Sequence, residues 1–135
     1  MVNPIVQVGN MLPQEITAAN AAADGSGSIV LALTAGKNGS KVYGVTFRNS
    51  RPTEAASSAM LCKVFLSNTV GTGFKIIGEV ALPSVTRSGT QVGAAATISF
   101  TPNLDLLEGQ CIGVTKSIHV GTQDNVSVVV LAGDI

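Results

Sequence analysis

Side chains that carry catalytic or metal chemistry are scarce in this sequence of 135 residues. It has one histidine, one tyrosine, two cysteines and no tryptophan, and charged residues make up 12% of the chain. Average soluble proteins have roughly 25% charged residues. One imidazole cannot supply the three or four ligands that a transition-metal site requires. We therefore expect no metal, no other cofactor and no enzymatic activity.

Three patterns point weakly to active or ligand sites. His119 could join a serine and Asp105 or Asp124 in a hydrolytic triad, but the sequence has no Gly-x-Ser-x-Gly elbow. Asp105 and Glu108 are the closest pair of acids, and we interpret them as turn residues rather than a glycosidase pair. The glycines of residues 71–78 lead into an expected strand, whereas a phosphate-binding loop opens a helix.

The charge pattern and the apolar runs of the sequence indicate neither a membrane nor a nucleic-acid partner. The eight basic and eight acidic residues cancel, and no lysine or arginine cluster favours a phosphate backbone. No apolar run approaches the roughly 20 residues that span a bilayer, and the first residues lack the cationic region of a signal peptide. We expect a protein that assembles in the cytoplasm, without a nucleic-acid or membrane partner.

The two cysteines, Cys62 and Cys111, both lie in expected strands. They could form one bridge, and the sequence alone does not decide whether they pair. A single bridge is not the disulfide framework of a small secreted domain. We expect buried free thiols, which suit a reducing compartment.

Short apolar runs separated by Gly, Asn, Ser, Asp and Pro fill the chain from residue 28 onward. This spacing predicts an all-β sandwich or barrel, and about eight strands with some long connections favour a two-sheet jelly roll. An immunoglobulin-like sandwich is the alternative, but this sequence lacks the tryptophan that such a domain has between its paired cysteines. The predicted strands cover residues 29–34, 41–49, 59–67, 74–82, 94–100, 111–117 and 125–132.

Residues 1–25 differ from the rest in composition, with prolines followed by an alanine-rich link. We interpret them as an extended N-terminal arm containing one edge strand, and residues 26–135 as a single β-sandwich domain. Asn38-Gly39 is the dipeptide that readily takes the positive φ angles of a tight hairpin turn. Residues 83–93 form the longest polar connection, and loops of this length are often functional or cross between sheets.

The segment from Gly27 to Arg48, with its Leu-Thr-Ala-Gly-Lys-Asn-Gly-Ser stretch, resembles the opening of small jelly-roll virion proteins of bacteriophages. Residues 64–66, 74–80, 107–114 and 126–133 resemble later strands of the same family. The resemblance implies a jelly-roll fold and a place on the capsid as a cement or decoration protein, often trimeric. It brings no catalytic residues.

The sequence and this resemblance together predict a virion structural protein that stabilises the phage head, with the major capsid protein and further copies of itself, as a homotrimer, as partners. A surface with few charges suits such contacts because little charge needs desolvating. We expect the contacts with capsid or neighbouring subunits to involve Val2, Pro4, Ile5, Val6, Val8 and Met11 in the arm, and Arg48, Arg51 and Arg87 beside polar loops.

The alternative function is a carbohydrate- or host-surface-binding module of a head fibre. Such sites often stack sugars on exposed aromatic rings, and the chain has five Phe and Tyr residues. Tyr43, Phe47, Phe74 and Phe100 fall on expected core faces, whereas Phe65 shares a face with Leu61 and Lys63. Phe65 is therefore the aromatic residue that this alternative would use.

Overall fold

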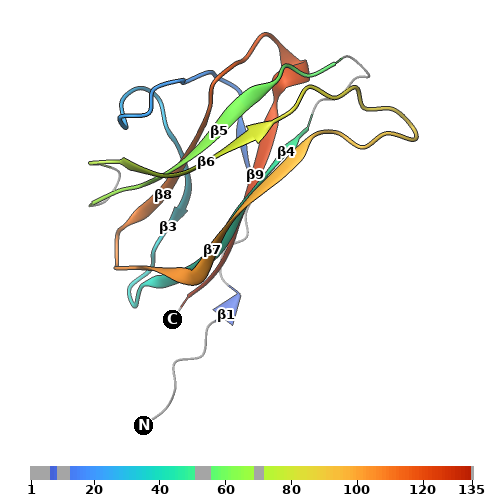
Figure 1. Ribbon diagram of the computed structural model, residues 1–135. Coiled ribbons are helices and arrows are strands. Elements are labelled where there is room, and N and C mark those ends of the chain that lie inside the picture. The colour runs from blue at the N-terminus through green and yellow to red at the C-terminus, as the bar shows by residue number, and fades with distance from the viewer. Residues whose placement is uncertain (1–6, 9–12, 51–55, 69–71, 135) are drawn as a thin grey trace.

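The computed structural model describes residues 7–8, 13–50, 56–68 and 72–134 of the chain (Figure 1). These residues are nearly all β, with one short 3-10 helix at Thr122–Asp124 and no helix long and apolar enough to cross a bilayer. The strands are β1 (Gln7–Val8), β2 (Gln14–Ile16), β3 (Val30–Thr34), β4 (Ser40–Asn49), β5 (Met60–Leu66), β6 (Lys75–Leu82), β7 (Ala95–Leu106), β8 (Cys111–Lys116) and β9 (Val126–Asp134).

The strands form two antiparallel sheets that face each other. Sheet A has the order β2-β9-β4-β7, with the short β1 also paired to β9, and sheet B has the order β3-β8-β5-β6. The eight strands from β2 to β9 pair first with last and inward from there: β2 with β9, β3 with β8, β4 with β7 and β5 with β6. This is the strand pairing of a jelly roll, in which one long hairpin is wound into a sandwich. The expected all-β two-sheet sandwich is thus confirmed.

Alternating apolar residues of both sheets fill the space between them. Val45 and Phe47 of β4 and Val128 and Val130 of β9 face Val64 of β5, and none of the five is more than 2% exposed. Burial of a side chain of this size stabilises the fold by about 1.5–3 kcal/mol. The period-two pattern in the sequence therefore identified the core positions of the central strands.

The expected edge strand in residues 1–25 is present, because β2 pairs with β9 and places Ile16 in the core. Strand β7 is longer than the predicted 94–100 and continues to Leu106, because it stays paired with β4 beyond a β-bulge at Val42/Gly44. Gly39 has a φ of 85°, as expected for a tight turn. This turn joins β3 of sheet B to β4 of sheet A, so the expected hairpin is wrong.

The connections gather at the two ends of the sandwich. The β4–β5, β6–β7 and β8–β9 connections lie at the end where β4 finishes and β7 and β9 begin. The β3–β4, β5–β6 and β7–β8 connections lie at the other end. Figure 1 shows the long β6–β7 connection on the right and the β7–β8 turn on the left. The two ends of β7 therefore carry two different loops about 40 Å apart, at the usual rise per strand residue.

Candidate functional site: an arginine pocket at one end of the sandwich

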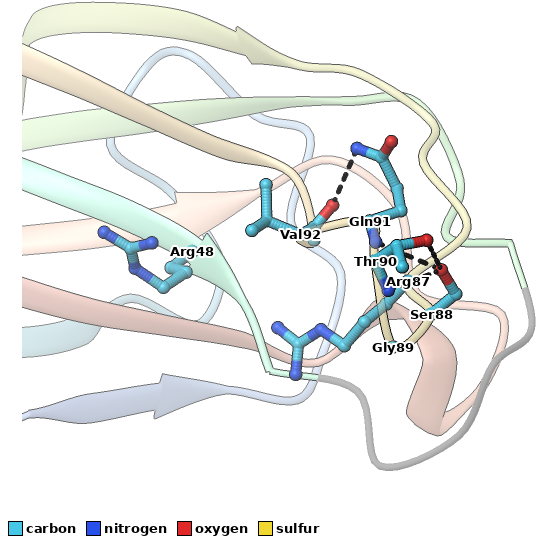
Figure 2. Close-up of a pocket in the computed structure, with 8 residues that line it drawn as sticks. Arg48, Arg87, Ser88, Gly89, Thr90, Gln91 and Val92 are labelled. Carbon is cyan, nitrogen blue, oxygen red and sulfur yellow. Dashed lines mark hydrogen bonds between the residues drawn. The ribbon is translucent and has the colours of Figure 1, made fainter.

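The β6–β7 connection and the end of β4 enclose an open pocket of about 380 Å3. Arg48 of β4 and Arg87 of the connection both line it, and in Figure 2 the Arg48 guanidinium points away from Arg87. The remaining lining residues are Ser88, Gly89, Thr90, Gln91, Val92 and Gly93. Arginine is the only charged residue type in this lining, so the pocket suits an anionic group, above all a carboxylate that a guanidinium can bind in bidentate fashion.

The Arg87 side chain is held in place on one side of the pocket. Its Nη2 atom donates a hydrogen bond of 2.5 Å to the backbone oxygen of Asn49. The guanidinium also lies against Gly93, where an added Cβ would come within 2.8 Å of Nη2. In Figure 2 the Arg87 side chain runs from the connection toward the strand that carries Arg48. Arg87 is therefore ordered before any partner arrives, which lowers the entropy cost of binding.

The turn beyond Arg87 is closed by its own hydrogen bonds. The Ser88 hydroxyl oxygen accepts bonds from the backbone N–H groups of Thr90, at 3.2 Å, and Gln91, at 3.1 Å. The backbone N–H of Ser88 donates to the oxygen of Gln91 at 3.0 Å. These bonds are typical of a serine that stabilises a tight turn. They hold Val92, which is 77% exposed, at the rim of the pocket.

Arg48 is the exposed charge at the end of β4. It stands on the outer face of sheet A between Ala95 of β7 and Ser127 of β9, and its side chain is exposed. Its guanidinium has no hydrogen-bond or ion-pair partner among the residues that the structure describes. A cation in this position can turn toward an incoming carboxylate without breaking an existing contact.

A buried polar network supports the pocket from behind. The Asn49 amide Nδ2 donates to the backbone oxygens of Gln123, at 2.8 Å, and Asn125, at 3.2 Å. The Asp124 carboxylate accepts three bonds, from the backbone N–H and hydroxyl of Ser58 and from the backbone N–H of Val120. The network thus ties the β4–β5 and β8–β9 connections to the strand end that carries Arg48.

Burial and hydrogen bonds shift the pKa values of Lys116, Asp124 and the nearby Cys62. Burial lowers the pKa of the Lys116 ammonium, although Asp124 nearby opposes the shift. Burial tends to raise the pKa of Asp124, but the hydrogen bonds from Ser58 and Val120 outweigh it and lower that pKa. Burial raises the pKa of the Cys62 thiol to about 12. A thiol held protonated in this way is a poor nucleophile.

His119 belongs to this network rather than to a metal centre. Its Nδ1 lies 2.8 Å from Lys116 Nζ, which also donates to the backbone oxygen of Asp124. In the described ranges no group of three or more His, Cys, Asp or Glu side chains could hold a metal ion. Cys62 and Cys111 are free and buried, as expected.

The two outer faces of the sandwich differ sharply. On sheet A the outward side chains between the Arg48 row and the Lys41 row carry no charge. They include Thr46 and Thr97, whose hydroxyls lie 3.0 Å apart, and Leu131, which is 52% exposed. The full set is Gly44, Thr46, Thr97, Ser99, Val129 and Leu131, and we call it the bare face.

Sheet B is partly covered by the chain itself, although Leu61 and Ile76 remain exposed. Ile29 and Phe74 lie over Gly113, where an added Cβ would come within 2.4 Å of Ile29 Cγ2 and 3.0 Å of the Phe74 ring. Phe65, which pairs with Gly113, is fully buried although it points outward. Phe65 is therefore not the exposed aromatic residue that the sequence suggested. Tyr43, at the bulge of β4, is 39% exposed instead of lying in the core.

The structure brings Arg48 and Arg87 together, although they are far apart in the sequence. Val8 lies in β1, where it pairs with Gly133. The other expected contact residues, Val2, Pro4, Ile5, Val6, Met11 and Arg51, lie outside the described residues. Sequence reasoning missed Val92 and the turn at residues 88–91, and the only available signal was the length of this polar connection.

Searches against protein-family models and against curated proteins found no match to this chain.

Proposed function

We propose that the protein is a non-enzymatic virion structural protein, a cement or decoration protein that binds the major capsid protein and stabilises a phage head. The observation that carries the proposal is the bare face of sheet A, which is uncharged and made of small or apolar residues. Small uncharged side chains cost little to desolvate and lose little side-chain entropy on contact. Such a surface suits a protein that stays bound to other proteins.

The size of the bare face limits how it can work. Seven residue steps along three strands give about 24 Å by 14 Å, or about 340 Å2. A stable interface buries about 800 Å2 on each partner. The bare face alone is therefore too small, and we assign the remaining contact to neighbouring subunits at the arginine pocket on its rim.

The proposal is tested on purified phage particles and empty heads. The protein should be found in the particles, and added protein should cosediment with heads that lack it. Leu131→Asp places a charge in the bare face and should weaken this binding about tenfold or more. Val120→Asp is the matched control, because Val120 is 73% exposed in the β8–β9 connection, away from the bare face. Absence from particles, or unchanged binding by Leu131→Asp, would contradict the proposal.

A carbohydrate- or host-surface-binding module of a head fibre is the second candidate. Tyr43 favours it, because this half-exposed ring stands beside the bare face and could stack on a sugar. The test is a glycan array with the wild type and with Tyr43→Ala. A specific signal that Tyr43→Ala abolishes supports this function, and an array without signals removes it.

A further inference from the structure

The arginine pocket has a complementary feature at the opposite end of the molecule. The β7–β8 turn carries Leu107 and Glu108, both exposed, and Leu107 is 76% exposed. The Glu108 carboxylate has no hydrogen-bond or ion-pair partner in the described ranges. An acid beside a large apolar side chain matches a pocket that offers two arginines beside the exposed Val92.

The turn is as well fixed as the pocket. The Leu107 backbone N–H donates to the Gln110 side-chain oxygen at 2.8 Å, and the Gln110 N–H donates back to the Leu107 oxygen at 3.1 Å. Gly109 has a φ of 84° and donates to the Ala35 oxygen at 3.2 Å. Both partners are thus ordered before they meet, which favours association because little freedom is lost.

One copy of the chain cannot bring the two features together. The pocket lies where β7 begins and the turn lies where β7 ends, and Figure 1 shows them on opposite sides of the molecule. A contact between them must therefore join two copies. Each copy then has one pocket and one turn to offer, which permits either a closed ring or an antiparallel pair.

We propose that the Arg48/Arg87 pocket receives the Leu107–Glu108 turn of a second copy of this chain. The Glu108 carboxylate pairs with the two guanidinium groups, and the Leu107 side chain packs on Val92. This contact identifies a second copy of the chain as the partner of the arginine pocket. It rests on the proposed function only in placing the contact on the capsid. Lys37 stands on the adjacent β3–β4 turn and forms no ion pair with Glu108.

Charge reversal tests the contact. The molar mass is measured by light scattering over a dilution series, at low and high salt, for the wild type, Arg48→Glu, Glu108→Arg and the double variant. Each single reversal should weaken self-association about tenfold or more, and the double variant should restore it. Association should weaken with salt, because exposed charges are screened. Lys75→Glu is the matched control, since Lys75 is an exposed cation at the start of β6 that belongs to neither the pocket nor the β7–β8 turn, and it should behave as the wild type.

A wild type that is monomeric at all concentrations, or association that both single reversals leave unchanged, would overturn the contact. So would a double variant that stays as weak as the single variants while circular dichroism shows a folded protein. Cosedimentation with heads separates this inference from the proposed function. Glu108→Arg should still bind heads, though more weakly than the wild type, because it keeps the bare face and loses the contact between subunits. Failure of the wild type to bind heads concerns the proposed function alone.

Discussion

The two sheets of this sandwich share one core but differ in what lies on their outer faces. Part of the outer face of sheet B is covered, because Ile29 and Phe74 lie over Gly113, and Phe65 and Thr115 are buried although they point outward. Leu61 and Ile76 of the same sheet remain exposed. Sheet A leaves Leu131 and its uncharged neighbours open to solvent, with no covering segment among the described residues. This difference supports the proposal that another protein covers the bare face.

Truncating an outward aromatic residue should give the largest difference in stability between the two faces. Phe65→Ala on sheet B should lower the free energy of unfolding by about 3–5 kcal/mol, because it leaves a cavity under the covering segment. Tyr43→Ala beside the bare face should cost less than about 1 kcal/mol, because the ring is half exposed. Urea denaturation measures both, and similar losses for the two variants would contradict the comparison.

The buried network behind the arginine pocket should give the next largest effect. Asp124→Asn should lower the free energy of unfolding by about 2 kcal/mol, because charge-assisted hydrogen bonds to Ser58 and Val120 are weakened. The folded pKa of Asp124 lies below its ordinary value of 3.8. Its contribution is therefore complete above pH 3.8 and is lost as the pH falls through the folded pKa.

The pH dependence itself sharpens this prediction. Thermal melts between pH 7 and pH 2 should show a smaller loss of stability in acid for Asp124→Asn than for the wild type. Identical acid dependence for Asp124→Asn and the wild type would contradict the role given to Asp124.

One small substitution by alanine on each outer face should give a smaller difference in stability. Gly113→Ala should cost about 1–2 kcal/mol, because its Cβ meets Ile29 and Phe74 and the covering segment must shift. Ser99→Ala on the bare face should stay within about 0.5 kcal/mol, since nothing covers that position. A tolerated methyl at Gly113 would mean that the covering segment is loosely held.

The thiols should show the smallest effect, which is an absence of reaction. Neither cysteine should react with a thiol reagent at pH 8 in the folded protein, because both are buried and the pKa of Cys62 is raised to about 12. Both should react in urea. Rapid labelling of one thiol in the native state would show that the sheet B side of the core opens easily.

Local pattern predicted most of the strands and the core of this protein. The alternation of β4 identified Val45 and Phe47 as buried, because a strand with one face on the core follows a period of two. The Gly39 turn was also predictable, because its dipeptide favours positive φ angles. The assignment of strands to sheets was not predictable, since the strands on either side of this turn, β3 and β4, belong to different sheets.

The errors at aromatic positions have two separate physical causes. Phe65 is buried although it points outward, and Ile29 and Phe74 lie over Gly113, its partner in the sheet. The alternation within β5 does not reveal that other parts of the chain cover this face. Tyr43 leaves the core because the β-bulge at Val42/Gly44 interrupts the alternation of β4. The meeting of Arg48 and Arg87 likewise depends on the return of the chain through β5 and β6, which sequence spacing does not contain.

The central claim is that the bare face of sheet A contacts another protein in the assembled particle. Hydroxyl-radical footprinting of the protein, free in solution and bound to phage heads, tests it most directly. Leu131 and Tyr43 should be oxidised in the free protein and protected on the head, while Leu61 on the outer face of sheet B stays equally reactive in both. Equal oxidation of Leu131 and Tyr43 in the free and bound states would contradict the claim.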